Sequence, residues 1–282
     1  MSEHQLEIRT MTRAELDTAI DWAADAGWNP GLGDADCFHV ADPDGYLMGF
    51  VDGRPAVCIS VIAYGQAYGF LGFYIAHPDF RGQGYGIQIW DAGMARFGDR
   101  VVGLDGVPDQ QHNYRKSGFE LAHRNVRYGG PIDPGETVFE GVVDASDMPV
   151  ERLLAYDRDF FPADRGAFTR CWLKPQSRVA KALVTDGEIS GYGVIRQCRD
   201  GYKIGPLFAD TPAGADTLVR ALAREAGGGM IFLDPPEPNA AAIALVERYG
   251  LAPSFETARM YKGTAPDLPT HRTFGITTFE LG

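Results

Sequence analysis

The sequence lacks the features that mark several large classes of protein. No segment approaches the roughly 18 consecutive apolar residues of a membrane-spanning helix, and the opening MSEHQLEIRT has no apolar signal core. Basic residues are scarce, since 26 Lys and Arg face 38 Asp and Glu, for a formal net charge of −12. So acidic a chain binds nucleic acid and anionic membranes poorly. We therefore expect a cytoplasmic protein that binds neither nucleic acid nor membrane.

Cysteine is also scarce and scattered. The chain has four, Cys37, Cys58, Cys171 and Cys198, with no C-x-x-C pair, and its six histidines show no metal-ligand spacing. Neither a zinc site nor a redox dithiol is expected, and no metal cofactor. Cys58 and Cys198 lie in apolar runs, which predicts that both are small core residues.

The most informative stretch runs from Leu71 to Gly86 with the sequence LGFYIAHPDFRGQGYG. Its first six residues are typical of a buried strand, and Pro78 ends that strand. The loop Arg81–Gly86 then precedes apolar residues at helical spacing. Small residues at a helix N-terminus point several N–H groups at one spot, with the positive end of the helix dipole behind them. The stretch therefore predicts an anion site, and phosphate is its usual occupant.

Several interpretations compete for this loop. A P-loop needs Gly-Lys-Ser/Thr, which is absent, and a Rossmann fingerprint needs glycine where Ile87 stands, although Asp105 could then serve as the ribose-binding acid. A glycine-rich turn without a ligand is the plain alternative. The pattern Arg81-x-x-Gly84-x-Gly86 resembles the Q/R-x-x-G-x-G/A motif of the GCN5-related N-acetyltransferases, whose loop holds the pyrophosphate of coenzyme A.

A second segment extends this resemblance. Residues 113–119, NYRKSGF, resemble the Y-x-K-x-G-F segment that follows the loop by about thirty residues in the same family. The resemblance implies that acetyl-CoA is the acyl donor and that one set of residues binds it: Tyr74, Ile75, Ala76, Arg81, Gly82, Gln83, Gly84, Tyr85, Gly86, Asn113 and Lys116.

The resemblance also implies catalytic roles. Tyr114 occupies the position of the general acid that protonates the leaving thiolate, although an amphipathic packing residue is the alternative. The base is less defined: Asp105 at the end of the next predicted strand, Asp34 and a water chain are candidates, and Asp105 could instead be a solvated strand-end residue. The loop Trp28–Asp34 is expected to bind the acceptor through Trp28, Asn29 and Asp34. A Trp that merely fills the edge of the core is equally consistent with the sequence.

The second half of the chain repeats the first. Residues 204–209 match 71–76 at an offset of 133, residues 247–251 match 115–119 at 132, and residues 185–187 match 51–53 at 134. Ordered matches at nearly constant offset predict two copies of one fold. We expect two α/β domains, 1–132 and 137–282, each with a mixed sheet flanked by helices.

The copies differ where the chemistry would lie. Opposite the loop, residues 211–215 read TPAGA and lack the arginine and the paired glycines, while Pro206 removes an N–H from the corresponding strand. The arrangement resembles tandem acetyltransferases with a degenerate second domain. Residues 160–172 stand where the Trp28 loop stands in the first copy, and either close the substrate pocket or pack between the domains.

Local patterns predict further elements. Residues 37–41 and 46–52 read as extended segments, and residues 129–135 as a linker. The resemblance implies direct acetyl transfer from acetyl-CoA to a primary amine of a small molecule or peptide, by a monomer or homodimer. A regulatory protein that senses acyl-CoA without turnover is the alternative.

Overall fold

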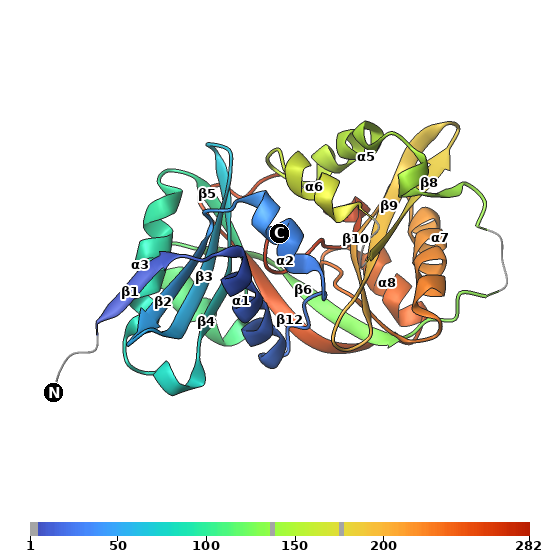
Figure 1. The fold of residues 1–282 in the computed structure, drawn as a ribbon. Helices are drawn as coiled ribbons and strands as arrows, with labels where there is room; N and C mark the ends of the chain where they lie inside the picture. The colour runs from blue at the N-terminus through green and yellow to red at the C-terminus, as the bar shows by residue number, and fades with distance from the viewer. Residues whose placement is uncertain (1–4, 136–138, 175–177) are drawn as a thin grey trace.

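A computed structural model describes residues 5–135, 139–174 and 178–282. The chain forms two lobes joined by long strands (Figure 1). The elements of the first half are β1 (Leu6–Thr10), α1 (Arg13–Asp25), α2 (Asp34–Ala41), β2 (Tyr46–Val51), β3 (Arg54–Tyr64), β4 (Tyr68–Ala76), α3 (Tyr85–Phe97), β5 (Val101–Gly106), α4 (Gln111–Lys116) and β6 (Glu120–Pro131).

The second half repeats this order of elements. They are β7 (Val142–Asp144), α5 (Val150–Asp157), α6 (Gly166–Trp172), β8 (Arg178–Thr185), β9 (Glu188–Gln197), β10 (Tyr202–Ala209), α7 (Pro212–Ala223), β11 (Met230–Leu233), α8 (Ala240–Arg248), β12 (Ala252–Lys262) and β13 (Thr273–Gly275). The repeat and the mixed α/β fold are thus confirmed.

Two local expectations were wrong. Residues 37–41 belong to helix α2 rather than to a strand, because packing of α2 against α6 overrides a weak local preference. Residues 129–131 are the end of strand β6 and pair with β11, so the expected linker overlaps the sheet. A capping box formed by Thr12 and Glu15 starts α1.

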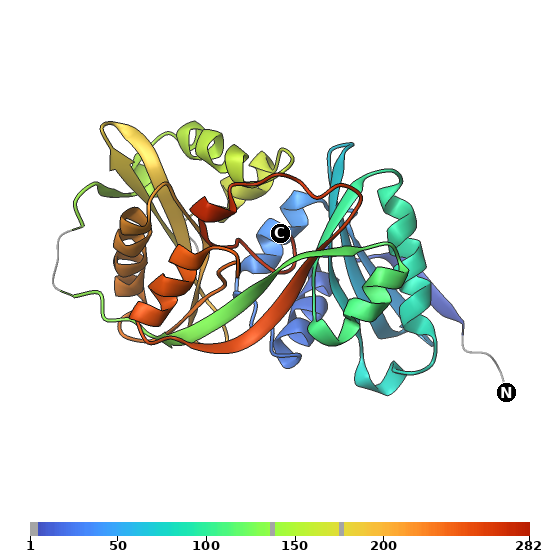
Figure 2. The same ribbon diagram turned by 180° about the vertical axis from the view of Figure 1, so that it is seen from behind.

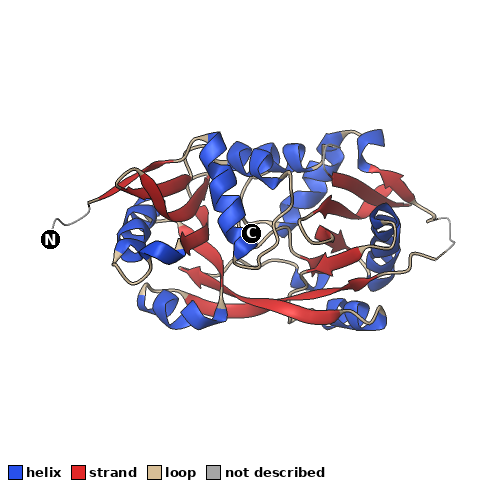
Figure 3. Ribbon diagram, turned by 60° about the horizontal axis from the view of Figure 1, so that its bottom comes forward, coloured by secondary structure: helices blue, strands red, loops and turns tan. Residues whose placement is uncertain are grey.

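The two halves exchange their long strands. The strand order is β1-β2-β3-β4-β5-β12-β6-β11-β10-β9-β8-β7, so β12 joins β5 of the first half and β6 joins β11 of the second. Strands β6 and β12 also pair with each other along most of their length, and Figure 3 shows them crossing between the lobes. A single sheet therefore runs through the whole molecule.

Helices α2 and α6 form a second contact between the two lobes. Phe38 of α2 stacks on Trp172 of α6 with ring centroids 6.0 Å apart, and Cys37 forms a disulfide with Cys171. The two cysteines are 134 residues apart, which is the offset of the repeat, so equivalent positions of the two copies meet. The spacing of the cysteines in the sequence does not indicate this pair, because the two residues meet only when the halves pack together. Cys58 and Cys198 are free and buried, as expected.

Buried ion pairs cross between the halves. Arg196 of β9 donates from Nε to Asp34 of α2 at 3.1 Å, and both side chains are 1% exposed. Arg127 of β6 makes a bidentate pair with Asp234, with N–O distances of 2.7 and 2.8 Å. Because both partners are buried, removal of either one would leave an uncompensated charge.

The last segment of the chain also crosses between the lobes, as Figure 2 shows in red. After β13, residues 276–281 are buried. Their backbone lies on the first half: a Cβ on Gly72 of β4 would overlap the carbonyl oxygen of Glu280, and the hydroxyl of Tyr64 donates to the carbonyl of Leu281. The second half thereby covers one face of β4.

Replacing Arg196 with Met should strongly destabilise the protein, since Asp34 would keep its buried charge and lose its ionic partner. We expect a loss of about 3–5 kcal/mol in the free energy of unfolding, measured by denaturant titration. Arg13→Met is the control, because it breaks an exposed ion pair with Asp17 and Asp36. It should change the free energy of unfolding by about 0–1 kcal/mol. Equal losses in the two variants would contradict a structural role for the buried pair.

Candidate active site

An opening between two parallel strands defines the site. Strands β4 and β5 pair from Tyr68 with Val101 to Leu71 with Leu104, and then part. On its other side β4 shifts register against β3, and Phe73 in this irregularity has φ +45°. A positive φ at an aromatic residue marks local backbone strain, which often accompanies function. Beyond Leu71, β4 therefore has an edge that β5 does not cover.

A small cavity of about 50 Å³ lies in this opening. Its lining includes the parted strands, the start of α4 and two aromatic residues from elsewhere: Leu71, Gly72, Phe73, Tyr74, Leu104, Asp105, Gly106, Val107, Gln110, Tyr114, Trp28 and Phe279. We call it the reaction cavity. Phe279 comes from the last segment of the chain, and no local motif signalled its role.

Tyr114 is held firmly in the wall of the reaction cavity. Its ring stacks on Trp90 of α3 with centroids 5.7 Å apart, and a Cβ on Gly106 would overlap it. Burial, followed by the nearby Tyr74, raises the pKa of the Tyr114 hydroxyl, which therefore stays protonated at neutral pH. Within the described ranges no side chain or backbone group bonds to this hydroxyl. It is a proton donor without a protein acceptor.

A groove of about 280 Å³ continues from the cavity toward the surface between α3 and α4. Tyr74, Gln110 and Tyr114 line both spaces, and the groove adds Ile87, Trp90, Asn113 and Ser117. Asn113 donates to the side chain of Gln110 at 2.8 Å, which fixes that wall. Lys116 is exposed and lies outside the lining of the groove.

The glycine-rich loop lies at the start of α3. Gly84 is the N-cap of this helix with φ +81°, a conformation that favours glycine, and a Cβ there would enter open space. Arg81 donates to the carbonyl of Ala76 at 3.0 Å, and Gln83 donates to that of Asp79 at 2.9 Å, so two side chains hold the loop's shape. In the described chain the N–H groups of Gly82 and Gly84 find no acceptor. The loop can therefore bind an anion.

The other loop residues support this geometry. Tyr85 is buried and its ring lies against Phe80, with centroids 6.3 Å apart. At Gly86 a Cβ would stand 3.0 Å from the hydroxyl of Tyr74. The Tyr74 hydroxyl therefore stands close to the space that a side chain at position 86 would need.

Asp105 is not the solvated strand-end residue that the sequence left open. Its side chain is 0% exposed and accepts two hydrogen bonds from Arg259 of β12, at 2.8 and 2.5 Å. Asn125 of β6 donates to the same carboxylate at 2.8 Å. Two exchanged strands thus hold Asp105 at the rim of the reaction cavity.

The residues of the loop Trp28–Asp34 lie in two different surroundings. Trp28 lines the reaction cavity, and its ring stacks on Phe73 with centroids 6.5 Å apart. Asn29 instead exchanges hydrogen bonds with Asp200, and Asp34 is buried against Arg196. Neither Asn29 nor Asp34 lines the reaction cavity. Both join the two halves of the molecule, a contact that sequence spacing does not reveal.

The equivalent opening of the second half is filled by the chain itself. Strands β10 and β11 part after Ile204 pairs with Leu233, and β13 then pairs with Leu207 and Phe208. These two residues correspond to Tyr74 and Ile75 in the repeat. The N-terminus of the equivalent helix, α7, is capped by the chain itself, because the Thr211 side chain accepts a hydrogen bond from the Gly214 N–H at 3.0 Å. The second copy therefore lacks both the free edge and the open loop.

Across the described residues, no group of three or more His, Cys, Asp or Glu could hold a metal ion. None of their helices is long and apolar enough to cross a membrane.

An uncovered strand edge can supply N–H groups to a reacting carbonyl, and the loop beside it can bind an anion, as the resemblance to the GCN5-related N-acetyltransferases implies. Family models agree: the "Acetyltransferase (GNAT) family" model matches residues 6–119, and an "Acetyltransferase (GNAT) domain" model matches residues 153–275. The chain belongs to the GCN5-related N-acetyltransferase family, with two such domains in tandem, and it is an acyltransferase.

Relatives match over nearly the whole chain. Holothin acyltransferase of Pseudoalteromonas sp. (strain SANK 73390) is 30% identical and covers 100% of this chain and 97% of its own. A putative acetyltransferase from Pyrococcus horikoshii superposes with TM-score 0.83 at 21% identity, over 100% of this chain and 98% of its own. A tandem GNAT protein from the clavulanic acid biosynthesis pathway has TM-score 0.65 at 16% identity, over 93% and 100%. The two structures support the fold.

Replacing Gly84 with Asp should abolish coenzyme A binding, because a carboxylate would enter the anion seat and the backbone there would be strained. Isothermal titration with coenzyme A measures the loss. Gly65→Asp is the matched control: Gly65 also has positive φ and open space, but it lies at the opposite end of β4. Unchanged affinity in Gly84→Asp would refute the assignment of the loop.

Proposed function

We propose that the chain transfers an acetyl group from acetyl-CoA directly to a primary amine of a small molecule. The observation that carries the proposal is the opening between β4 and β5, where the uncovered strand edge and Tyr114 line one cavity and its groove. The groove reaches Ile87 in the first turn of α3, which directly follows the anion-binding loop. Residues 1–132 form the catalytic domain in this proposal, and residues 137–282 form the degenerate one.

The residues around this space fit acetyl-CoA. The free N–H groups of the loop Arg81–Gly86 would hold the pyrophosphate, with the N-terminus of α3 behind them. The groove between Tyr74 and Asn113 would take the pantetheine arm, and the backbone of Tyr74, Ile75 and Ala76 would hold it along the uncovered edge. Lys116 lies near this groove on α4 and would contribute positive charge from outside its lining.

Bound acetyl-CoA would supply a thioester whose carbon–sulfur bond breaks as the new carbon–nitrogen bond forms. Backbone N–H groups of the uncovered β4 edge would stabilise the negative charge that develops on the carbonyl oxygen, because they are fixed before the reaction. Tyr114 would donate its proton to the departing thiolate. The attacking amine loses one proton, which restores the Tyr114 hydroxyl through solvent, so charge and protons balance.

Asp105 suits a positioning role. Arg259 compensates its charge and Asn125 occupies a further acceptor site, so the carboxylate is fixed in direction at the rim of the cavity. The Arg259–Asp105 pair would hold the end of β5 in place beside the incoming amine, and water in the opening would take the amine proton. Trp28 would form the opposite wall for the acceptor.

Similarity to an enzyme named holothin acyltransferase makes holothin the first acceptor to test. The assay mixes the protein, acetyl-CoA and an amine, and follows free thiol with a colorimetric reagent. We expect saturable thiol release with holothin or another small amine in the panel. Coenzyme A binding without thiol release from any amine would favour the sensor alternative.

Measuring Tyr114→Phe in the same assay tests whether the Tyr114 hydroxyl acts as the general acid or whether the residue only packs in the wall. The variant keeps the ring on Trp90 and removes only the hydroxyl, so turnover should fall about 10²-fold, the lower end for general acid catalysis. The KM for acetyl-CoA should change little, and thermal unfolding should match the wild type. Wild-type turnover in this variant would leave Tyr114 as a packing residue.

A further inference from the structure

The reaction cavity is too small for a whole acceptor. Its 50 Å³ compares with about 10–15 Å³ for one enclosed water molecule and with roughly 300–1,000 Å³ for ordinary ligand sites. It has room for a few water-sized groups. The remainder of any acceptor must therefore bind in a neighbouring space.

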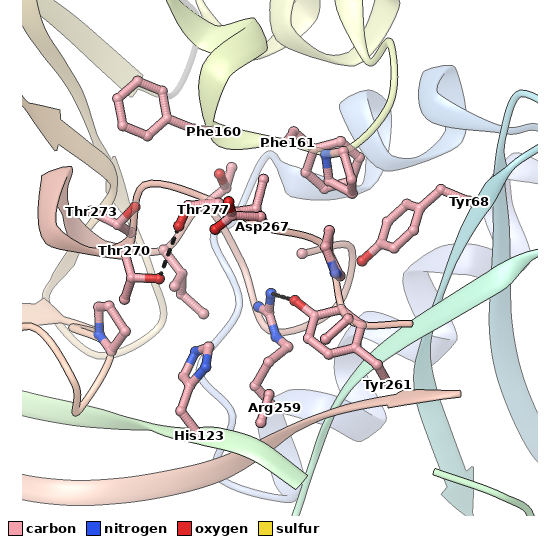
Figure 4. Close-up of a pocket in the computed structure, with 18 of the residues that line it drawn as sticks. Tyr68, His123, Phe160, Phe161, Arg259, Tyr261, Asp267, Thr270, Thr273 and Thr277 are labelled. Carbon is pink, nitrogen blue, oxygen red and sulfur yellow. Dashed lines mark hydrogen bonds between the residues drawn. The ribbon is translucent and has the colours of Figure 1, made fainter. Parts of the chain in front are cut away.

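Such a space lies between the two halves. We call it the interdomain pocket; its volume is about 200 Å³ (Figure 4). The first half contributes Tyr68 of β4 and His123 of β6. The second half contributes Phe160, Phe161 and Arg259, together with the segment that connects β12 to β13. The pocket exists only because the halves are joined.

Aromatic rings form its walls. Phe160 and Phe208 stack face to face with centroids 4.0 Å apart, and Phe161 meets Tyr68 edge to face at 5.5 Å. Tyr261 adds a further ring from β12. Rings that hold one another in place form a rigid wall, and a planar ring system packs on such a wall by offset stacking or edge-to-face contact.

The polar groups of the interdomain pocket carry little free positive charge. The charge of Arg259 is balanced by Asp105, and that of Arg165 by Asp157. Burial, with Arg259 adding to it, lowers the pKa of His123 to about 4, so its ring is neutral at neutral pH. Asp267 stands exposed among the lining residues and adds negative charge at the rim. A neutral or cationic ligand fits this lining better than an anion.

The Arg259–Asp105 pair lies between the interdomain pocket and the reaction cavity. Arg259 lines the pocket, Asp105 lines the cavity, and the two residues face each other across paired strands. Adjacent strands lie about 4.8 Å apart, so the spaces are separated by roughly one strand spacing. Figure 4 shows Arg259 directed into the pocket, where its Nη1 donates to the Tyr261 hydroxyl at 3.5 Å.

We propose that the interdomain pocket binds the planar aromatic or heteroaromatic ring system of the acceptor, whose amine extends along the Arg259–Asp105 pair into the reaction cavity. This inference rests on the proposed function and specifies its acceptor class. It also gives the degenerate half a function, because Phe160, Phe161 and Phe208 come from that half.

Filling the pocket tests the proposal. Ala265 lines it from an exposed loop, so Ala265→Trp should occupy the space without disturbing the core. We expect the KM for holothin to rise at least tenfold while the KM for acetyl-CoA stays constant. Thr264→Trp is the matched control, since its neighbour Thr264 is exposed and lies outside the lining. It should behave as the wild type.

Two further measurements separate this inference from the proposed function. In the wild type, tryptamine should exceed cadaverine at least tenfold in kcat/KM, and Ala265→Trp should erase the difference. Calorimetric titration of holothin into the protein saturated with coenzyme A reports acceptor binding without turnover, and Ala265→Trp should weaken it at least tenfold.

The outcomes are distinct. Turnover that is equal in Ala265→Trp and Thr264→Trp would overturn the pocket assignment and leave the proposed function intact. A second outcome is that the wild type binds holothin without releasing thiol and that Ala265→Trp abolishes this binding. That outcome would overturn the proposed function and leave the assignment of the pocket intact. Absence of holothin binding in the wild type, together with a preference for cadaverine, would overturn the acceptor class.

Discussion

The pairing of β6 with β12 is the contact on which the rest of the molecule depends. Each strand leaves its own half, and together they carry one sheet from β1 to β7. Because β12 lies next to β5, Arg259 reaches Asp105, and because β6 lies next to β12, Asn125 reaches the same carboxylate. The rim of the reaction cavity is thus built by strands from both copies. Separate lobes would lack it.

The two copies share one fold, but the opening beside the central strand is free in the first copy and filled in the second. In the first copy the edge of β4 beyond Leu71 is not covered by β5, and the loop before α3 keeps free N–H groups. In the second copy β13 pairs with the corresponding edge, and Thr211 caps the corresponding helix. Backbone groups must find partners when they are buried. The second copy finds them within the chain, whereas the first leaves them for a ligand.

Local motifs predicted the parts of the site that depend on neighbouring residues. The glycine loop, the strand before it and the repeat could be predicted from local patterns, and Tyr114 was predicted from its resemblance to a family motif. Contacts between the halves could not be predicted from local patterns in the sequence. Phe279 in the cavity, Arg259 on Asp105 and the Cys37–Cys171 disulfide each join residues more than 130 positions apart. Helix α2 was missed for the same reason, since its packing on α6 sets its structure.

The central claim is that the chain has one open acyl-CoA site and one that it fills itself. Isothermal titration of the full-length protein with coenzyme A tests this claim most directly, because it counts sites without needing the acceptor. We expect saturation at one coenzyme A per chain. Saturation at two per chain would contradict it.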